Sequence, residues 1–175
     1  DRGCRVAVGE TYGASQRGGS VMSHVRVSMK MDPSVLIPSG EAHIIIGFEP
    51  LETLRMVRKY AGKDTTVVYD PRPVYPLGVL QGIQQYPAVE DIAAEIRDLT
   101  AMALAVPAAG IAMEAGDSKA ANIALLGAFS QLPDAPLSRE DLEKILLQRF
   151  KGTVLEVNQR AFAMGCEAAG KGAGL

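Results

Sequence analysis

The sequence from Glu10 to Arg26 combines Gln16, Arg17 and several glycines in a pattern that could bind an anion. The candidate binding residues of this loop are Tyr12, Gly13, Gln16, Arg17, Gly18 and Gly19. The planar guanidinium of Arg17 presents a rigid fork of N–H donors that matches a carboxylate or a phosphate. Glycines adopt positive φ and let a ligand or another backbone approach closely. The same residues also fit a structural turn in which Arg17 pairs with Glu10 or with loop carbonyls, so two interpretations stay open.

The remaining reactive side chains form no recognisable catalytic or metal-binding pattern. His24 and His43 have no partner at metal-ligand spacing, and a zinc or iron site needs several converging ligands. No Gly-x-Ser-x-Gly elbow is present, which argues against a hydrolase that uses such a serine. Cys4 and Cys166 are isolated thiols, as expected in a reducing cytoplasm, so we expect a cytoplasmic protein without a disulfide framework.

Three polar residues near the ends of predicted elements have structural explanations. Asp70 and Asp117 fit turns or helix caps, which aspartate forms readily. Asn122 lies in the apolar block Ala-Ala-Asn-Ile-Ala-Leu-Leu-Gly, where an amide must find hydrogen-bond partners if it is buried. We expect Asn122 to fix a neighbouring loop or to face another subunit.

The composition is that of one folded domain without nucleic-acid or membrane character. A chain of 175 residues buries roughly 70% of its unfolded surface and can form a hydrophobic core. The sequence is 47% hydrophobic and lacks tryptophan, which fits either an aliphatic core or an apolar surface for a partner subunit. A net charge of −2 argues against nucleic acid. The longest apolar stretch, 100–115, is interrupted by Pro107 and Gly110 and is too short to span a bilayer.

Apolar periodicity predicts several strands. They are 4–8, 21–30, 43–48, 65–69 and 101–106. In the second of these, Val21, Val25, Val27 and Met29 alternate with polar residues, which predicts a half-exposed strand with His24 on the polar face. Only a glycine-rich connection joins the first two strands, so we expect them to pair antiparallel.

The predicted helices follow from an apolar period of 3.6 residues and from signals at their ends. They are 50–60, 89–99, a helix that ends at Ala115, 119–131, a helix that begins at Ser138, and 153–168. Gly116 is expected to cap the helix before it, and Ser138 with Asp141 has the spacing of a capping box. We expect a single domain at 1–169 and a flexible tail at 170–175.

These elements predict an α/β protein with a three-layer, Rossmann-like domain and a mixed, mostly parallel sheet. In open α/β sheets, ligands bind beyond the carboxyl ends of the strands. That edge would gather the loop 12–19, Glu49 and Pro50, the segment 70–73 and the turn near Pro107.

Four sequence blocks resemble one known family. They are the Ser-Gln-Arg-Gly-Gly-Ser-Val block around Arg17 and the segments 37–55 (IPSGEAHIIIGFEPLETLR), 113–129 (MEAGDSKAANIALLGAF) and 155–165 (LEVNQRAFAMG). Their order and spacing resemble the small, gamma-type subunits of 2-oxoacid:ferredoxin oxidoreductases. The first block and the Gly-Phe-Glu-Pro-Leu-Glu block are most similar to the beta subunit of indolepyruvate:ferredoxin oxidoreductase. The resemblance covers nearly the whole chain.

This resemblance implies a small subunit that does not bind thiamine. The whole enzyme would convert an aryl pyruvate and CoA to an acyl-CoA, CO2 and reduced ferredoxin, as in anaerobic metabolism. Thiamine diphosphate and iron–sulfur clusters would belong to a large partner subunit, because this sequence has no Gly-Asp-Gly motif and only two cysteines. The chain alone would hold no cofactor and be inactive. The alternatives are a stand-alone module that binds CoA or a nucleotide, and a purely structural partner subunit.

The sequence departs from the family pattern at two places. Family members begin with a strand and a Gly-x-Gly-Gly-Gln-Gly turn, and this chain starts at Asp1 without either. We therefore expect roughly 25 residues before Asp1, the length of one strand and one helix. Asp117 stands where the family usually has asparagine, so a cap or contact made by that amide is not carried over.

Overall fold

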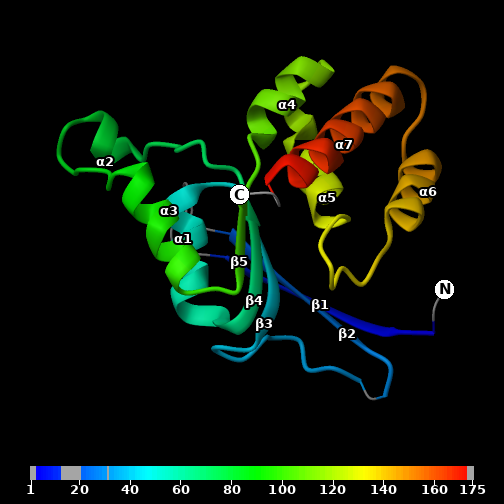
Figure 1. Cartoon of the computed structure of the whole chain (residues 1–175), viewed down its shortest axis with the longest axis horizontal. Coiled ribbons are helices and arrows are strands. Elements are labelled where there is room, and N and C mark those ends of the chain that lie inside the picture. The colour runs from blue at the N-terminus through cyan, green and yellow to red at the C-terminus, as the bar shows by residue number, and fades with distance from the viewer. Residues whose placement is uncertain (1–2, 13–20, 31, 173–175) are drawn as a thin grey trace.

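A computed structural model describes residues 3–12, 21–30 and 32–172, and Figure 1 shows a sheet with helices on both faces and a hairpin that extends beyond it. The strands are β1 (Arg5–Tyr12), β2 (Val21–Ser28), β3 (Ala42–Gly47), β4 (Ala61–Tyr69) and β5 (Met102–Ala105). The helices are α1 (Pro50–Tyr60), α2 (Leu77–Leu80), α3 (Val89–Asp98), α4 (Ala108–Ala115), the 3-10 helix η1 (Ser118–Ala120), α5 (Ala121–Phe129), α6 (Arg139–Arg149) and α7 (Gly152–Gly172). The predicted α/β class is confirmed.

The strands β3, β4 and β5 form a parallel sheet with β4 in the centre. On β4, Val67 and Tyr69 belong to one buried core cluster and Val68 belongs to the other. Successive side chains of a strand point to opposite faces, which explains this division. The apolar residues 67–69 at the end of β4 suit this position, because a layer of helices covers each face.

Two helical layers enclose this sheet, as predicted (Figure 1). The helices α1 and α3 pack on one face through side chains that include Val57 and Ile96. The helices α4, α5, α6 and α7 form the other layer, and their shared core includes Leu125, Leu146 and Phe162. Each layer has its own apolar cluster, with the sheet between them.

The strands β1 and β2 pair antiparallel, as predicted, with Val8 opposite Val25. Within the described residues they form a two-stranded sheet of their own, whereas the sequence predicted that they join the parallel strands in one mixed sheet. The separation arises because the hairpin packs against the rest of the chain through one face, not through a strand edge.

The packed face of the hairpin is the one that carries His24. This side chain is buried, its Nδ1 accepts the N–H of Ile37 at 3.2 Å, and its ring meets the Tyr60 ring edge-on with 5.2 Å between centroids. Gly9 lies opposite His24, where a Cβ would collide with Val35. The expectation that this polar face is the exposed one was wrong. Alternation shows that one face is apolar, but it does not show which face the rest of the chain covers.

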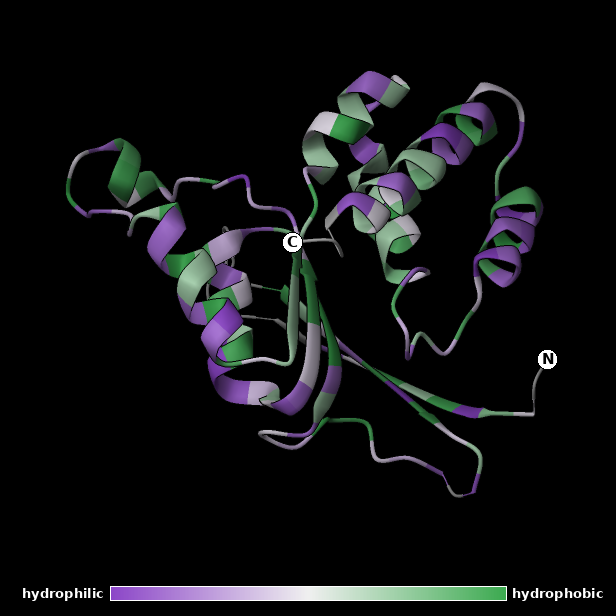
Figure 2. Ribbon diagram, viewed as in Figure 1, coloured by the Kyte–Doolittle hydropathy of each residue, from purple (hydrophilic) through white to green (hydrophobic). Residues whose placement is uncertain are grey.

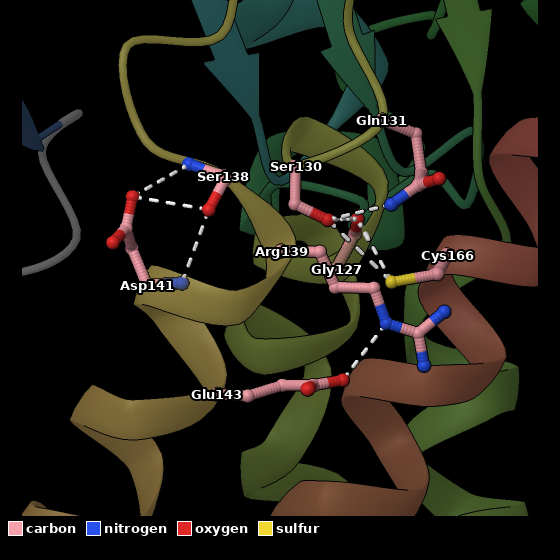
Figure 3. A network of polar contacts seen from close by, with 8 residues as sticks. All are labelled: Gly127, Ser130, Gln131, Ser138, Arg139, Asp141, Glu143 and Cys166. Carbon is pink, nitrogen blue, oxygen red and sulfur yellow. Dashed lines mark hydrogen bonds and ion pairs between the residues drawn. The ribbon is translucent and has the colours of Figure 1, made fainter.

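The ends of several helices follow their local sequence signals. Gly116 ends α4 in the left-handed region with φ 117°. At the start of α6, the N–H of Asp141 donates to Ser138 Oγ at 3.2 Å, and the Asp141 carboxylate accepts the Ser138 N–H in return (Figure 3). The helix α7 extends beyond its predicted end, so residues 170–172 of the expected tail are helical. The short helix α2 was not predicted, because four residues are too few to show a period.

The helices α5 and α7 approach so closely that two contact positions require glycine. A Cβ at Gly127 would collide with the carbonyl oxygen of Phe162, and one at Gly165 would collide with that of Ala124. Beside this contact, the thiol of Cys166 donates to the carbonyl of Gly127 at 3.3 Å (Figure 3). The packing of α5 against α7 in the second helical layer therefore requires glycine at positions 127 and 165.

We predict that Gly127→Ala lowers the free energy of unfolding by about 1–3 kcal/mol, because the added methyl group must push α5 and α7 apart. The matched control is Gly170→Ala in α7, where a new Cβ meets no atom within 4 Å. That change should be neutral or slightly stabilising, since alanine favours a helix more than glycine does. Urea denaturation measures both effects, and equal midpoints for the two variants would contradict the close contact.

Candidate functional site

The predicted binding loop is described only at its beginning. Tyr12 is the last residue of β1, and its backbone pairs with Val21 at the start of β2. The other candidate residues lie outside the described part of the chain and are Gly13, Gln16, Arg17, Gly18 and Gly19. Their role in binding stays a prediction.

The carboxyl ends of β3, β4 and β5 meet at one edge of the sheet, because the strands are parallel. Asp70 follows β4 at this edge and is buried. Its carboxylate accepts the N–H of Arg72 at 3.0 Å and the N–H of Ala109 at 2.8 Å. One carboxylate therefore holds a turn and caps the first turn of α4. The structural interpretation of Asp70 is confirmed.

Glu49 occupies a second helix N-terminus at the same edge. Its carboxylate caps α1 by accepting the N–H of Glu52 at 2.8 Å, and the hydroxyl of Tyr86 donates to the same carboxylate. Burial raises the pKa of the Tyr86 hydroxyl, and the hydrogen bond to Glu49 raises it further, because a phenolate would lie beside a carboxylate. Tyr86 thus acts as a hydrogen-bond donor and is not activated as a base or nucleophile.

Both helix N-termini at this edge are therefore occupied by the protein's own carboxylates. Free N–H groups and the helix dipole would otherwise favour an external anion at these positions. A phosphate that approached α1 or α4 would meet the negative charge of Glu49 or Asp70 instead. The N-termini of α1 and α4 are therefore not free to bind an external anion.

A cavity of about 550 Å³ lies between α1 and the segment that carries α2. Two arginines line it, Arg55 and Arg58, and each is already paired with a glutamate. Arg58 Nε donates to Glu95 Oε1 at 2.6 Å, and this hydrogen bond raises the pKa of the guanidinium and lowers the pKa of the carboxylate. Because both guanidinium groups have a partner, the cavity offers no arginine that is free to hold an anion.

The outer face of the hairpin is apolar and exposed. We call it the valine face, and its members are Val6, Val8, Val21, Val25 and Val27. Each of them is between 50% and 63% exposed, and the register places Val6 opposite Val27 and Val8 opposite Val25. Figure 2 shows hydrophobic residues along both strands of this hairpin. A contiguous exposed apolar face of this kind is typical of a protein–protein contact.

A second exposed apolar segment surrounds α2, which has no buried residue. Its large side chains, which are between 48% and 75% exposed, are Val74, Tyr75, Leu77, Leu80 and Ile83. Composition indicated that an apolar surface was possible, but it gave no location. For the valine face, the sequence did carry a signal, which is the alternation of apolar and polar residues along β2.

The other polar candidates serve local structure or lie at the surface. Asp117 accepts the N–H of Lys119 at 2.9 Å at the start of η1, which confirms the expected cap. His43 and Asn122 are exposed. Among the described residues, no group of three or more His, Cys, Asp or Glu could hold a metal ion. None of the described helices is both long enough and apolar enough to cross a bilayer.

Comparison with known proteins places the chain in a family. Residues 1–168 match the family model described as pyruvate ferredoxin/flavodoxin oxidoreductase. The indolepyruvate oxidoreductase subunit IorB of Thermococcus kodakarensis is 36% identical over 174 residues, which cover 99% of this chain and 85% of that protein. The protein of the same name from Archaeoglobus fulgidus is 35% identical over 163 residues, which cover 93% of this chain and 80% of that protein.

Solved structures share the fold. The 2-oxoglutarate:ferredoxin oxidoreductase from Magnetococcus marinus aligns with a TM-score of 0.66 at 25% identity, covering 97% of this chain and 26% of that chain. The gamma subunit of a keto/oxoacid ferredoxin oxidoreductase from Geobacter sulfurreducens aligns with a TM-score of 0.62 at 21% identity, covering 97% of this chain and 82% of that chain. These matches confirm the resemblance carried by the four sequence blocks, and the chain belongs to the pyruvate ferredoxin/flavodoxin oxidoreductase family.

Proposed function

We propose that this chain is the small subunit of an indolepyruvate-type 2-oxoacid:ferredoxin oxidoreductase. The observation that carries the proposal is the 36% identity, over 99% of the chain, to a protein named as a subunit of indolepyruvate oxidoreductase. The complete enzyme would turn an aryl pyruvate and CoA into an acyl-CoA, CO2 and reduced ferredoxin. The related enzyme from Magnetococcus marinus was solved with 2-oxoglutarate, coenzyme A and succinyl-CoA bound, which supports CoA as the acyl acceptor.

In this proposal the reactive cofactors lie on a large partner subunit. Decarboxylation of a 2-oxo acid needs an electron sink such as thiamine diphosphate, and single-electron transfer to ferredoxin needs iron–sulfur clusters. A cluster is held by several cysteine thiolates, and this sequence has only Cys4 and Cys166. Cys166 is buried against α5 and already donates to the carbonyl of Gly127, which makes it unsuitable as a cluster ligand.

The alternative of a stand-alone module for CoA or a nucleotide has less support. Such a module would use helix N-termini or free cations to bind phosphate. Glu49 and Asp70 fill the N-termini of α1 and α4, and Arg55 and Arg58 are paired with glutamates. These helix N-termini and these two arginines are therefore not available for that chemistry.

The valine face is the surface that we assign to the large subunit. Burying an apolar side chain contributes about 1.5 kcal/mol or more when it moves fully out of water. Five half-exposed valines on one flat hairpin face therefore offer a substantial driving force for association. The loop 12–19 joins the two strands of this hairpin, so docking there would carry the residues from Tyr12 to Gly19 with it. Those residues would then contact the substrate, CoA or the partner.

The first prediction of this proposed function is that the purified chain has no oxidoreductase activity and no visible chromophore, while adding the thiamine-containing large subunit gives activity. Anaerobic reconstitution with an aryl pyruvate, CoA and a viologen acceptor measures this. Reduction of the viologen by this chain alone, or activity of the large subunit that does not rise when this chain is added, would contradict the proposed function.

The second prediction is that Arg17→Lys lowers turnover of the assembled enzyme more than it lowers the melting temperature of the chain. Lysine keeps the positive charge but loses the bidentate fork that reads a carboxylate or a phosphate. Turnover should fall by roughly tenfold, which is the effect of about 1.4 kcal/mol. A variant that melts early and has normal turnover per folded complex would instead support the structural interpretation of Arg17.

The third prediction concerns the valine face. The double variant Val8→Ser/Val25→Ser should weaken association with the large subunit by at least about tenfold, because two opposed apolar side chains are lost from the contact. The melting temperature of the isolated chain should change little, since both side chains are more than half exposed. The matched control is Ile145→Ser/Leu147→Ser on α6, which also removes two exposed apolar side chains and should leave association unchanged. Equal losses in the two double variants would contradict docking through the hairpin.

A further inference from the structure

The segment that carries α2 is the longest stretch of the sequence without Asp, Glu, Lys, Arg or His. We call residues 73–89 the α2 arm. Two other long charge-free stretches are 99–113 and 120–133. Their side chains Leu104 and Leu125 lie in the core. The structure describes every residue of the α2 arm, and none of them is buried. Burial within the chain therefore does not explain why the arm carries no charge.

The α2 arm presents apolar side chains to the solvent. Val74, Leu77, Leu80 and Ile83 are each between 57% and 75% exposed. Figure 2 shows hydrophobic residues in α2 and beside it. An exposed apolar patch of this kind is typical of a protein–protein contact.

The α2 arm is ordered by contacts of its own chain. At its base, the ring of Tyr75 meets the ring of Tyr86 edge-on, with 5.2 Å between the centroids. The Tyr86 hydroxyl donates to the Glu49 carboxylate, which ties the base of the arm to the start of α1. Beyond α2, the N–H of Ile83 donates to the carbonyl of Gly78 at 2.8 Å and closes a turn. Because these contacts order the arm before a partner arrives, binding would cost little conformational entropy.

The total exposed surface of the chain leaves room for more than one partner. The chain exposes 11195 Å². A folded monomer of 18.5 kDa is expected to expose about 8,200 Å². The difference of about 3,000 Å² is larger than the roughly 800 Å² that a standard interface covers on each partner. Figure 1 shows α2 at one end of the long axis, while the hairpin extends towards the opposite end. A large subunit docked on the valine face would therefore leave the α2 arm uncovered.

We propose that the α2 arm binds the α2 arm of a second copy of this chain. A two-fold axis brings the same patch of both copies face to face, so a residue near the axis meets its own copy. A charged residue there would meet a like charge, and the α2 arm has none. Partners of a different sequence are usually selected through complementary charges, which the arm does not offer. Only the placement of the large subunit at the hairpin rests on the proposed function.

The test is sedimentation velocity of the purified chain, in a Val8→Ser/Val25→Ser background that removes association through the valine face. We expect a reversible dimer with a dissociation constant in roughly the micromolar range, as for contacts at the small end of the interface sizes. Leu80→Glu and Leu80→Lys should each weaken the dimer by at least about tenfold, because each places like charges in the contact. Both variants should fold, since Leu80 is 69% exposed.

A mixture of the two variants tests whether one arm meets another. Equal amounts of the Leu80→Glu and Leu80→Lys chains should restore the dimer, because opposite charges then face each other across the contact. The matched controls are Met113→Glu and Met113→Lys on α4, where the side chain is 67% exposed. Each control should dimerise as tightly as the unaltered arm.

The proposal is overturned if the chain stays monomeric at about 100 μM, well above the expected dissociation constant. It is also overturned if the Leu80 variants dimerise normally, or if their mixture associates no better than either variant alone. These measurements use no large subunit, so they are separate from the proposed function. A monomeric chain that supports activity would refute only the dimer, and a dimeric chain that supports none would refute only the subunit assignment.

Discussion

The distance between α5 and α7 is the constraint on which the second helical layer depends. At Gly127 and Gly165 the backbone of one helix touches the backbone of the other, so no side chain separates them. This contact brings Phe162 into the core that α4 and α6 also share. It also holds the early turns of α7 near the end of α4, where Gly116 lies beside Val157. The cavity of about 590 Å³ that is lined by Gly116, Phe150 and Val157 is thus bounded by elements whose positions follow from a backbone contact.

A different principle organises the edge of the parallel sheet. In many α/β proteins the helix N-termini at this edge bind a ligand's phosphate or carboxylate. Here Glu49 and Asp70 satisfy those N–H groups, and the same carboxylates connect neighbouring elements through Tyr86 and Arg72. The hydrogen bonds at this edge therefore hold the fold together instead of holding a ligand. This arrangement supports the proposed role, in which the subunit would act beside a larger catalytic partner through its surfaces and its loop.

Much of the fold could be predicted because its signals are local. Gly116, Ser138 and Asp141 mark helix ends through the conformations and hydrogen bonds that those residue types favour. The inward face of the hairpin could not be predicted, because it depends on contacts with Val35, Ile37 and Tyr60, which lie outside the two strands.

The candidate sites were predictable to a smaller extent. The structural role of Asp70 followed from its residue type at the end of a strand, but its second bond, to Ala109, required the fold. No signal in the sequence indicated that Asn158 is buried, since an asparagine within a helix is common. The binding role of the loop around Arg17 stays a prediction from the sequence.

The exposed valine face also affects how long an unassembled copy of the protein would survive in a cell. An unassembled copy presents an extended apolar hairpin to the surrounding solution, and exposed apolar strands of this type pair readily with other chains. Chaperones and proteases recognise the same feature when they sort incomplete assemblies from finished ones. In the proposed assembly, the lifetime of this subunit would therefore depend on the supply of the large subunit that covers the hairpin, and balanced synthesis of the two chains would be a condition for its accumulation.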